Sequence, residues 1–434
     1  MPVIVERVGY MSFNRRLGAI FSCLCLLSAT IAYGQVTAPA STPAAALTPA
    51  APAPAPPPPA RPHPRDPVSP EVLPDRSVIF RLLAPDAKTV TIQTWDILDA
   101  WAAAGLVPKI PELTKNADGV WEVTTPPIPP GAYRYLFKVD GVQFADPDNP
   151  AVSESNEMVW SLVVVPGADF VDDHDSIPHG SVSEVFYHST SLGRQRRMHV
   201  YLPPGYENGK EKYPVFYLLH GSSDSDASWS TVGRANFILD NLIASGKAVP
   251  MVVVMPAGHT SRRAYERPAL DGKPRRDEFG EDFINDIMPY VEKNYRVRTD
   301  RAHTAIAGLS MGGEQALNIS ITHLDRFAYV GVWSAGVFAG PRHRTAEEVW
   351  PPTSVSPEWI QEHTADLDNA ALKKGLKLLW FGTGADDHLL PISKATIATL
   401  KDHGFNPVFV QSTGGHNWGN WRDYLNEFAP QLFH

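Results

Sequence analysis

From about residue 181 onward, short and almost continuously apolar segments alternate with longer segments of helical pattern. Strands without interspersed polar residues are typical of a sheet buried on both faces, and strand–helix alternation is typical of a parallel, doubly wound sheet. Residues 181–434 are therefore expected to form one α/β domain. The predicted strands are 213–219, 251–255, 303–309, 329–334, 377–381 and 407–411, and the predicted helices are 235–245, 282–295, 313–322 and 394–403.

Residues 75–165 follow a different pattern, made of short segments rich in valine, isoleucine, threonine and aromatic residues. In 131–139, Tyr133, Tyr135, Phe137 and Val139 occupy every second position, which is typical of a half-buried strand. Similar segments at 77–83, 88–94, 119–124 and 159–165 predict a small β-sandwich of the immunoglobulin type, with a short helical insertion at 96–106. Residues 166–180 are acidic and are expected to be a solvated linker.

The first 74 residues lack the pattern of a folded domain. Arg15 and Arg16 precede an apolar run at 17–32, and the small-x-small sequence 32–34 follows it, as in a secretory signal peptide. The run is shorter than the roughly 20 residues of a transmembrane helix, which disfavours an uncleaved anchor. Residues 1–34 are thus expected to be a signal peptide and 35–74, rich in proline and alanine, a semi-rigid linker.

The cysteine content and the net charge limit the chemistry and the partners expected of the chain after signal cleavage. The two cysteines, Cys23 and Cys25, both lie in the predicted signal peptide, so the remainder has no thiol for a disulfide, a nucleophile or a metal ligand. A lipoprotein acylated at Cys23 is the weaker alternative to free secretion. The 434 residues carry a net charge of −9, which disfavours a nucleic-acid partner. We therefore expect a secreted or periplasmic protein, without membrane attachment after signal cleavage.

The strongest chemical signal is the sequence Gly308-Leu309-Ser310-Met311-Gly312, which follows an apolar strand and opens a helical segment. This is the context of a G-x-S-x-G nucleophile elbow, where a strained turn presents the serine hydroxyl above the sheet. A serine hydroxyl is a poor nucleophile at neutral pH and needs a general base. Ser310 is therefore predicted to be the nucleophile of a catalytic triad.

The base and the acid are expected downstream, in the order serine, acid, histidine. His416 stands in a glycine-rich loop after the last predicted strand, at the carboxyl edge of the sheet, where such sites gather. Asp386 and Asp387 follow the strand before it, and one of them would hold the imidazole in its productive tautomer. The sequence favours Asp387, with Asp386 as the alternative.

An oxyanion hole needs two backbone N–H groups near the nucleophile. Met311, directly after Ser310, is expected to supply one, and Ser222, in the loop after an earlier strand, the other. Substrate contacts are expected from Trp350 and Trp359, in a segment that interrupts the strand–helix rhythm, and from Trp418, beside His416. No metal and no cofactor are required.

These residues resemble the esterase D-like branch of the α/β-hydrolases, and 181–434 is similar to the secreted feruloyl esterases of that branch. The matching motifs are RMHVYLPPGY at 197–206, YPVFYLLHG at 213–221 and Gly-Gly-His at 414–416. The family's Gly-x-x-Asp-x-Leu motif fits 384–389 and selects Asp387. Residues 75–165 are similar to the early-set, carbohydrate-binding-like sandwich that precedes some of these esterases, through VIFRLLAP at 78–85 and PGAYRY at 130–135.

The resemblance implies a serine esterase that releases hydroxycinnamic acid from ester-bearing plant polysaccharide or oligosaccharide. The same branch contains siderophore esterases, so an exported siderophore or other small-ester esterase is the alternative enzyme. A glycan-binding protein with an inactive hydrolase fold is the alternative outside catalysis. The polar loop 222–226 departs from the glycine-rich loop of many feruloyl esterases, which bears on the acyl preference. The sequence does not indicate an oligomeric state.

Overall fold

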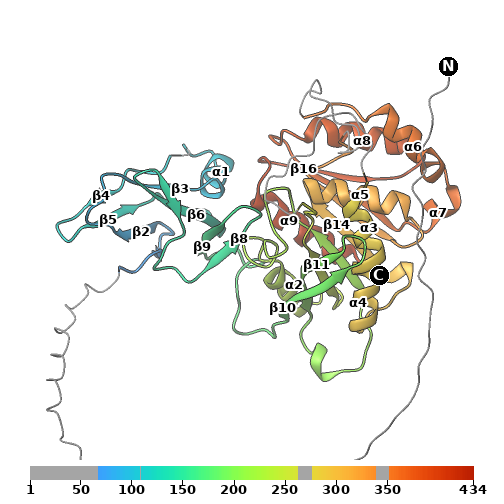
Figure 1. Ribbon diagram of the computed structural model, residues 1–434, viewed down its shortest axis with the longest axis horizontal. Coiled ribbons are helices and arrows are strands. Elements are labelled where there is room, and N and C mark those ends of the chain that lie inside the picture. Colours follow the sequence, from blue (N-terminus) through green and yellow to red (C-terminus); the bar gives the residue numbers. More distant parts are fainter. Residues whose placement is uncertain (1–66, 108, 262–275, 339–350) are drawn as a thin grey trace, which may run out of the picture. The chain divides into compact units, whose positions relative to one another are not determined.

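The apolar segments of the C-terminal half form one sheet (Figure 1). Its eight strands have the order β10-β11-β13-β12-β14-β15-β16-β17. β10 and β11 run antiparallel to their neighbours, and the remaining strands are parallel. The computed structural model describes residues 67–107, 109–261, 276–338 and 351–434. The strands are β10 (Ser181–Ser189), β11 (Arg194–Leu202), β12 (Val215–Leu219), β13 (Val252–Pro256), β14 (Thr304–Leu309), β15 (Tyr329–Trp333), β16 (Leu378–Gly384) and β17 (Val408–Ser412).

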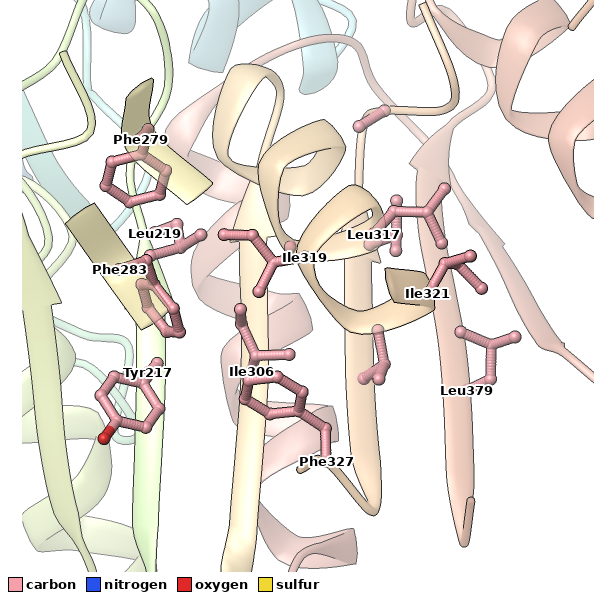
Figure 2. Packing of buried hydrophobic residues seen from close by; sticks show 14 of the residues in the cluster. Tyr217, Leu219, Phe279, Phe283, Ile306, Leu317, Ile319, Ile321, Phe327 and Leu379 are labelled. Atoms are coloured by element: carbon pink, nitrogen blue, oxygen red, sulfur yellow. The ribbon is translucent and has the colours of Figure 1, made fainter. Parts of the chain in front are cut away.

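Helices pack on both faces of this sheet, as the doubly wound pattern predicts (Figure 1). One face is covered by α3 (Glu278–Asp282), α4 (Met288–Asn294), α5 (Met311–Thr322), α6 (Pro357–Leu367), α7 (Ala370–Lys374) and α8 (Leu390–Asp402). The other face carries α2 (Ala235–Ala244) and α9 (Trp418–Phe428). Figure 2 shows the first face, where Tyr217 of β12 meets Phe283 with ring centroids 4.9 Å apart, beside Ile306 of β14.

The segments of 75–165 form two antiparallel sheets around one hydrophobic core, which confirms the predicted sandwich. Phe80 and Tyr135 meet in that core with ring centroids 4.6 Å apart. The first sheet contains β1 (Glu71–Val72), β2 (Val78–Leu83), β5 (Val120–Thr124) and β4 (Thr114–Lys115). The second contains β3 (Val90–Gln93), β6 (Gly131–Val139), β9 (Val159–Val165) and β8 (Val152–Glu154), with β7 (Val142–Phe144) paired to β6.

The observed elements differ from the expected ones in several places, because the sequence pattern did not predict β4, β7 and β8 of the sandwich or α6, α7 and α9 of the α/β part. β1 pairs with β2, so ordered structure begins within the segment expected to be linker. The hairpin β10–β11 was not predicted, because its many charged side chains hide the apolar positions that are buried. The expected helical insertion is present as α1 (Asp96–Ala103), which buries Ile97 and Trp101. The predicted signal peptide and most of the predicted linker lie outside the described residues.

Residues 63–434 form one compact unit, and its described residues join the sandwich to the α/β part. The buried guanidinium of Arg422, in α9, donates to the carbonyl of Ala132 in β6 at 3.0 Å and to that of Val232 at 2.9 Å. Ala132 also belongs to the hydrophobic cluster under α2 and α9. Among the described helices, none has the length and apolar character needed to cross a bilayer.

The carboxylate of Asp286 closes the turn between β10 and β11. It accepts hydrogen bonds from the backbone N–H of Thr190 and of Ser191, each at 2.9 Å. Burial by itself would raise the pKa of Asp286, but the hydrogen bonds from Thr190 and Ser191 outweigh it and lower the pKa from 3.8 to about 2. The ionised form is therefore favoured by folding.

Asp286→Asn is expected to lower the free energy of unfolding at pH 7 by about 2 kcal/mol, since each pKa unit corresponds to about 1.4 kcal/mol. Because the pKa of Asp286 is lowered in the folded state, its ionisation stabilises the fold at pH values above the unfolded pKa near 4. This contribution disappears as the pH falls toward 2. Urea unfolding at several pH values measures the difference between variant and wild type. A difference that stays constant from pH 7 to pH 2 would contradict the assignment.

Candidate active site

Ser310 lies at the sharp turn between β14 and α5, with φ 51° and ψ −119°. A positive φ is uncommon for a residue other than glycine, and such strain persists only where the surroundings impose it. Here the N–H of Ser310 donates to the carbonyl of Trp333 in β15 at 2.8 Å, and its own carbonyl accepts from the N–H of Gly313 at 3.0 Å. The turn is held on both sides, with Ser310 at the carboxyl edge of the sheet.

The glycines of the motif are required by close backbone approach. A Cβ on Gly312 would lie 2.5 Å from the carbonyl oxygen of His220, and one on Gly313 would lie 2.6 Å from Cβ of Ala335. A Cβ on Gly308 would overlap the carbonyl of Gly312. The β12 loop, the nucleophile turn and the end of β15 can therefore pack together only without side chains at these positions.

Gly308→Ala is expected to destabilise the fold by about 3 kcal/mol, because the atoms in the way belong to the backbone and cannot rotate aside. The midpoint of urea unfolding measures this effect. Gly209→Ala is the matched control, since the nearest heavy atom to its added Cβ would be 3.9 Å away. Equal midpoints for the two variants would contradict this expectation, because they would show that the turn can accommodate a Cβ at Gly308.

Asp387 and His416 meet at the ends of neighbouring parallel strands, β16 and β17. Nδ1 of His416 lies 3.1 Å from each carboxylate oxygen of Asp387, whose side chain is fully buried. Burial raises the pKa of Asp387, but the hydrogen bond and charge of His416 and the N–H of Leu389 outweigh it, so the pKa is lowered. Asp386 is exposed, and its backbone N–H donates to the carbonyl of Gly414. Of the two aspartates, Asp387 is the one paired with His416.

A chain of contacts runs from the imidazole back toward the nucleophile turn. The ring of His416 packs edge-on against Trp421 of α9, with centroids 5.0 Å apart. The indole N–H of Trp421 donates to Oγ of Ser334 at 2.9 Å. Ser334 follows Trp333, whose carbonyl holds Ser310. The strand order β14-β15-β16-β17 thus gathers Ser310, Asp387 and His416 at one edge of the sheet.

The two expected oxyanion donors belong to the nucleophile turn and to the loop after β12. Met311 is the first residue of α5, so its N–H has no acceptor within the helix. Ser222 is exposed in the turn after β12, and a Cβ on the preceding Gly221 would lie 3.5 Å from Cβ of Ser310. The Met311 amide therefore directly follows Ser310, and the Ser222 amide follows a glycine that packs near Ser310.

His220 has a structural position in the same loop. Its buried ring donates from Nδ1 to the carbonyl of Gly221 at 2.8 Å, and Nε2 accepts from the N–H of Gly258 at 2.8 Å. Burial lowers the pKa of His220, which favours the neutral ring. The imidazole joins the β12 loop to the end of β13 and has both nitrogens engaged, so it is not a competing base.

Comparisons with known proteins identify the family of this chain. A model of the Esterase family, described as "Putative esterase", matches residues 189–432. The chain belongs to this esterase family. It is 32% identical over 363 residues to an endo-1,4-beta-xylanase/feruloyl esterase of Xylanibacter ruminicola, covering 82% of this chain and 44% of the relative. It is 25% identical over 268 residues to endo-1,4-beta-xylanase Y of Acetivibrio thermocellus, covering 56% and 22%. The chain thus spans less than half the length of these relatives.

A solved structure shares the fold over both parts of this esterase-family chain. The enterobactin esterase FES from Shigella flexneri aligns with a TM-score of 0.52 at 18% identity, covering 82% of this chain and 93% of that one. This likeness concerns the fold alone. Together with the family match, it confirms the predicted α/β-hydrolase fold.

Two of the three tryptophans expected to touch substrate are buried in the core. Trp359 is buried in the core beside α5, and its indole N–H donates to Oδ1 of Asn318 at 2.9 Å. Trp418 is 2% exposed and packs edge-on against Trp229 and Trp421. Neither offers a free face to a substrate in this structure, because their large apolar rings fill the core. Trp350 lies outside the described residues.

Other residues near the site carried no sequence signal. His388 is half-exposed beside His416, with ring centroids 4.7 Å apart. Ligand atoms of Asp387, His388 and His416 lie within 4.8 Å of one another, so the three could hold a divalent cation. Such a cation would occupy the same imidazole and carboxylate as the Asp387–His416 pair. In α1 of the sandwich, partial desolvation and the charge of Asp96 raise the pKa of Asp99, and the charge of His416 opposes this shift.

Proposed function

We propose that this protein is a secreted serine carboxyl-ester hydrolase that releases hydroxycinnamic acid, such as ferulic acid, from plant cell-wall polysaccharide. The observation that carries the proposal is the pairing of His416 with the buried Asp387 carboxylate at the sheet edge where the strained Ser310 turn also lies. Membership of the esterase family supports the reaction class. The relative from Xylanibacter ruminicola, an endo-1,4-beta-xylanase/feruloyl esterase, supports the substrate class.

In the proposed mechanism Ser310 attacks the ester carbonyl while Nε2 of His416 takes the hydroxyl proton. Asp387 keeps the other proton on Nδ1 and stabilises the imidazolium that forms. The N–H groups of Met311 and Ser222 would bind the oxyanion of the tetrahedral intermediate, and the dipole of α5 would favour the same charge. His416 then protonates the departing sugar oxygen as its bond to the carbonyl carbon breaks, so the sugar leaves as a hydroxyl and the acyl group stays on Ser310.

Deacylation repeats the sequence with water as the nucleophile. His416 takes a proton from water, the hydroxide attacks the acyl-Ser310 carbonyl, and the same two amides bind the second oxyanion. The proton on His416 returns to Oγ of Ser310 as the hydroxycinnamic acid leaves. Each step moves one proton to or from His416, whose partners are Ser310, the departing sugar oxygen and water, so the proposal needs no metal or cofactor.

A panel of esters tests the substrate class. Methyl ferulate and feruloylated arabinoxylan oligosaccharide are expected to be hydrolysed with kcat/KM about a hundredfold above that of a ferric catecholate trilactone, because acyl pockets discriminate by fit. Preferred turnover of the trilactone would replace the plant polysaccharide by a siderophore. Labelling with a fluorophosphonate tests the mechanism separately, and an unlabelled wild-type protein would favour a glycan-binding role without catalysis.

A further inference from the structure

The turn that carries Ser222 is bordered by residues of the sandwich. The N–H of Asp224 donates to the carbonyl of Gly221 at 3.1 Å and closes the turn. Ser155, next to β8, forms an antiparallel β-bridge with Asp224, and the N–H of Asn156 donates to the carbonyl of Ser223 at 3.3 Å. The backbone on the outer side of this turn is therefore paired with the N-terminal domain.

Arg134, in β6 of the sandwich, reaches the same turn with its side chain. Nη1 donates to Oδ1 of Asp224 at 2.8 Å, and Nε and Nη2 donate to the carboxylate of Asp96 at 3.0 and 3.3 Å. The side chains of Arg134 and Asp224 are only 14% and 3% exposed. Burial raises the pKa of Asp224, and the Arg134 guanidinium opposes that shift. The guanidinium thus favours the ionised, correctly placed carboxylate.

Within this turn, the backbone of Gly221 packs near both the Asp224 carboxylate and the nucleophile. A Cβ on Gly221 would be 3.2 Å from Oδ2 of Asp224 and 3.5 Å from Cβ of Ser310. Little space therefore separates the carboxylate, the Gly221 backbone and the serine. A displacement of Asp224 would be transmitted to the amide of Ser222, and oxyanion stabilisation falls steeply when a donor leaves its position.

We propose that Arg134 is a positioning residue for the reaction: through Asp224 it holds the Ser222 amide in the oxyanion hole, so the sandwich completes the active site. This inference rests on the proposed function, because it needs Ser310 to form an oxyanion. The sandwich then has a catalytic consequence that does not depend on whether it binds a glycan.

If Arg134 only held the sandwich and the α/β part together, removing another contact between these parts should lower activity in the same way. Glu154, in β8, forms an ion pair with Arg197 of β11 at 2.8 Å, which also joins the sandwich to the α/β part. The Glu154 side chain is 42% exposed and its carboxylate does not contact the 221–224 turn. Glu154→Gln therefore removes an ion pair between the same two parts and leaves the turn in place, which makes it the matched control for Arg134→Gln.

The experiment compares full-length Arg134→Gln, Asp224→Asn, the double variant and Glu154→Gln on p-nitrophenyl acetate. Rates are divided by the concentration of sites titrated with a fluorophosphonate. Arg134→Gln is expected to lower kcat by about 10- to 100-fold with KM within twofold, because the lost interaction acts in the transition state. The inhibition constant of phenylboronic acid, whose serine adduct is tetrahedral, is expected to rise by a similar factor.

The double variant is expected to be no slower than the slower single variant, because both changes break the same link. Glu154→Gln is expected to keep kcat within twofold. Wild-type kcat per titrated site in Arg134→Gln, or an equal loss in Glu154→Gln, would overturn the inference. If Arg134→Gln does not fold, Asp224→Asn, which preserves side-chain shape, carries the same test. A wild-type chain that neither labels nor hydrolyses the ester would instead overturn the proposed function itself.

Discussion

Replacing Ser310 with alanine is expected to lower kcat by about six orders of magnitude, the loss seen when a triad nucleophile is removed. The substitution deletes one oxygen atom and leaves the strained turn intact, since the backbone bonds to Trp333 and Gly313 remain. Folding should therefore be unaffected while the acyl-enzyme can no longer form. Initial rates on methyl ferulate at saturation, with the urea midpoint as a check on folding, measure the two effects separately.

The same variant should lose all labelling by a fluorophosphonate, because that reagent forms a bond to the activated serine. Ser245→Ala is a suitable control: its hydroxyl donates to the carbonyls of Asn241 and Leu242 at the end of α2, away from the site, so labelling and rate should match the wild type. Residual labelling of Ser310→Ala at the wild-type rate would assign the nucleophile to another residue.

Asp387→Asn is expected to lower kcat by about 10⁴-fold, the second-largest effect. An asparagine amide can donate to Nδ1 of His416, which would place the imidazole proton on Nε2 and leave no lone pair for the Ser310 hydroxyl. The carboxylate is fully buried and bonded to His416 through both oxygens, so no other residue can take its place without rearrangement. Steady-state rates on methyl ferulate provide the measurement.

Asp386→Asn is the neighbouring control and should retain kcat within twofold, because its side chain is exposed and its backbone contact to Gly414 is unchanged by the substitution. If Asp386→Asn lost as much activity as Asp387→Asn, the two aspartates would have to exchange roles in solution. If Asp387→Asn kept more than a tenth of the activity, the imidazole would not depend on this carboxylate.

The nucleophile turn was predictable because its determinants are local. A strand, a strained residue and a helix follow one another within the segment 304–322, and the glycines needed for close packing lie within five positions of Ser310. The parallel strands were equally readable, because burial on both faces leaves a continuous apolar run. Chain order then limited the base and the acid to short loops after the last strands.

Tertiary structure decided what depends on segments distant in the chain. Asp386 and Asp387 are adjacent in sequence. The sequence favoured Asp387 but left Asp386 open, and the structure pairs the Asp387 carboxylate with His416. Trp359 and Trp418 are buried in the core. A tryptophan ring suits an apolar core as well as a substrate cleft, so the residue type alone could not distinguish these two locations.

Sequence alone determined the elbow and the parallel strands of the sheet, since these follow from local conformational preference and strand burial, and it predicted the order of serine, acid and histidine. The fold alone decided that Arg134, 90 residues before Asp224 in the chain, meets its carboxylate. No periodicity or motif records such a pairing, because the energy of a buried ion pair depends on which distant groups the packed domains bring together.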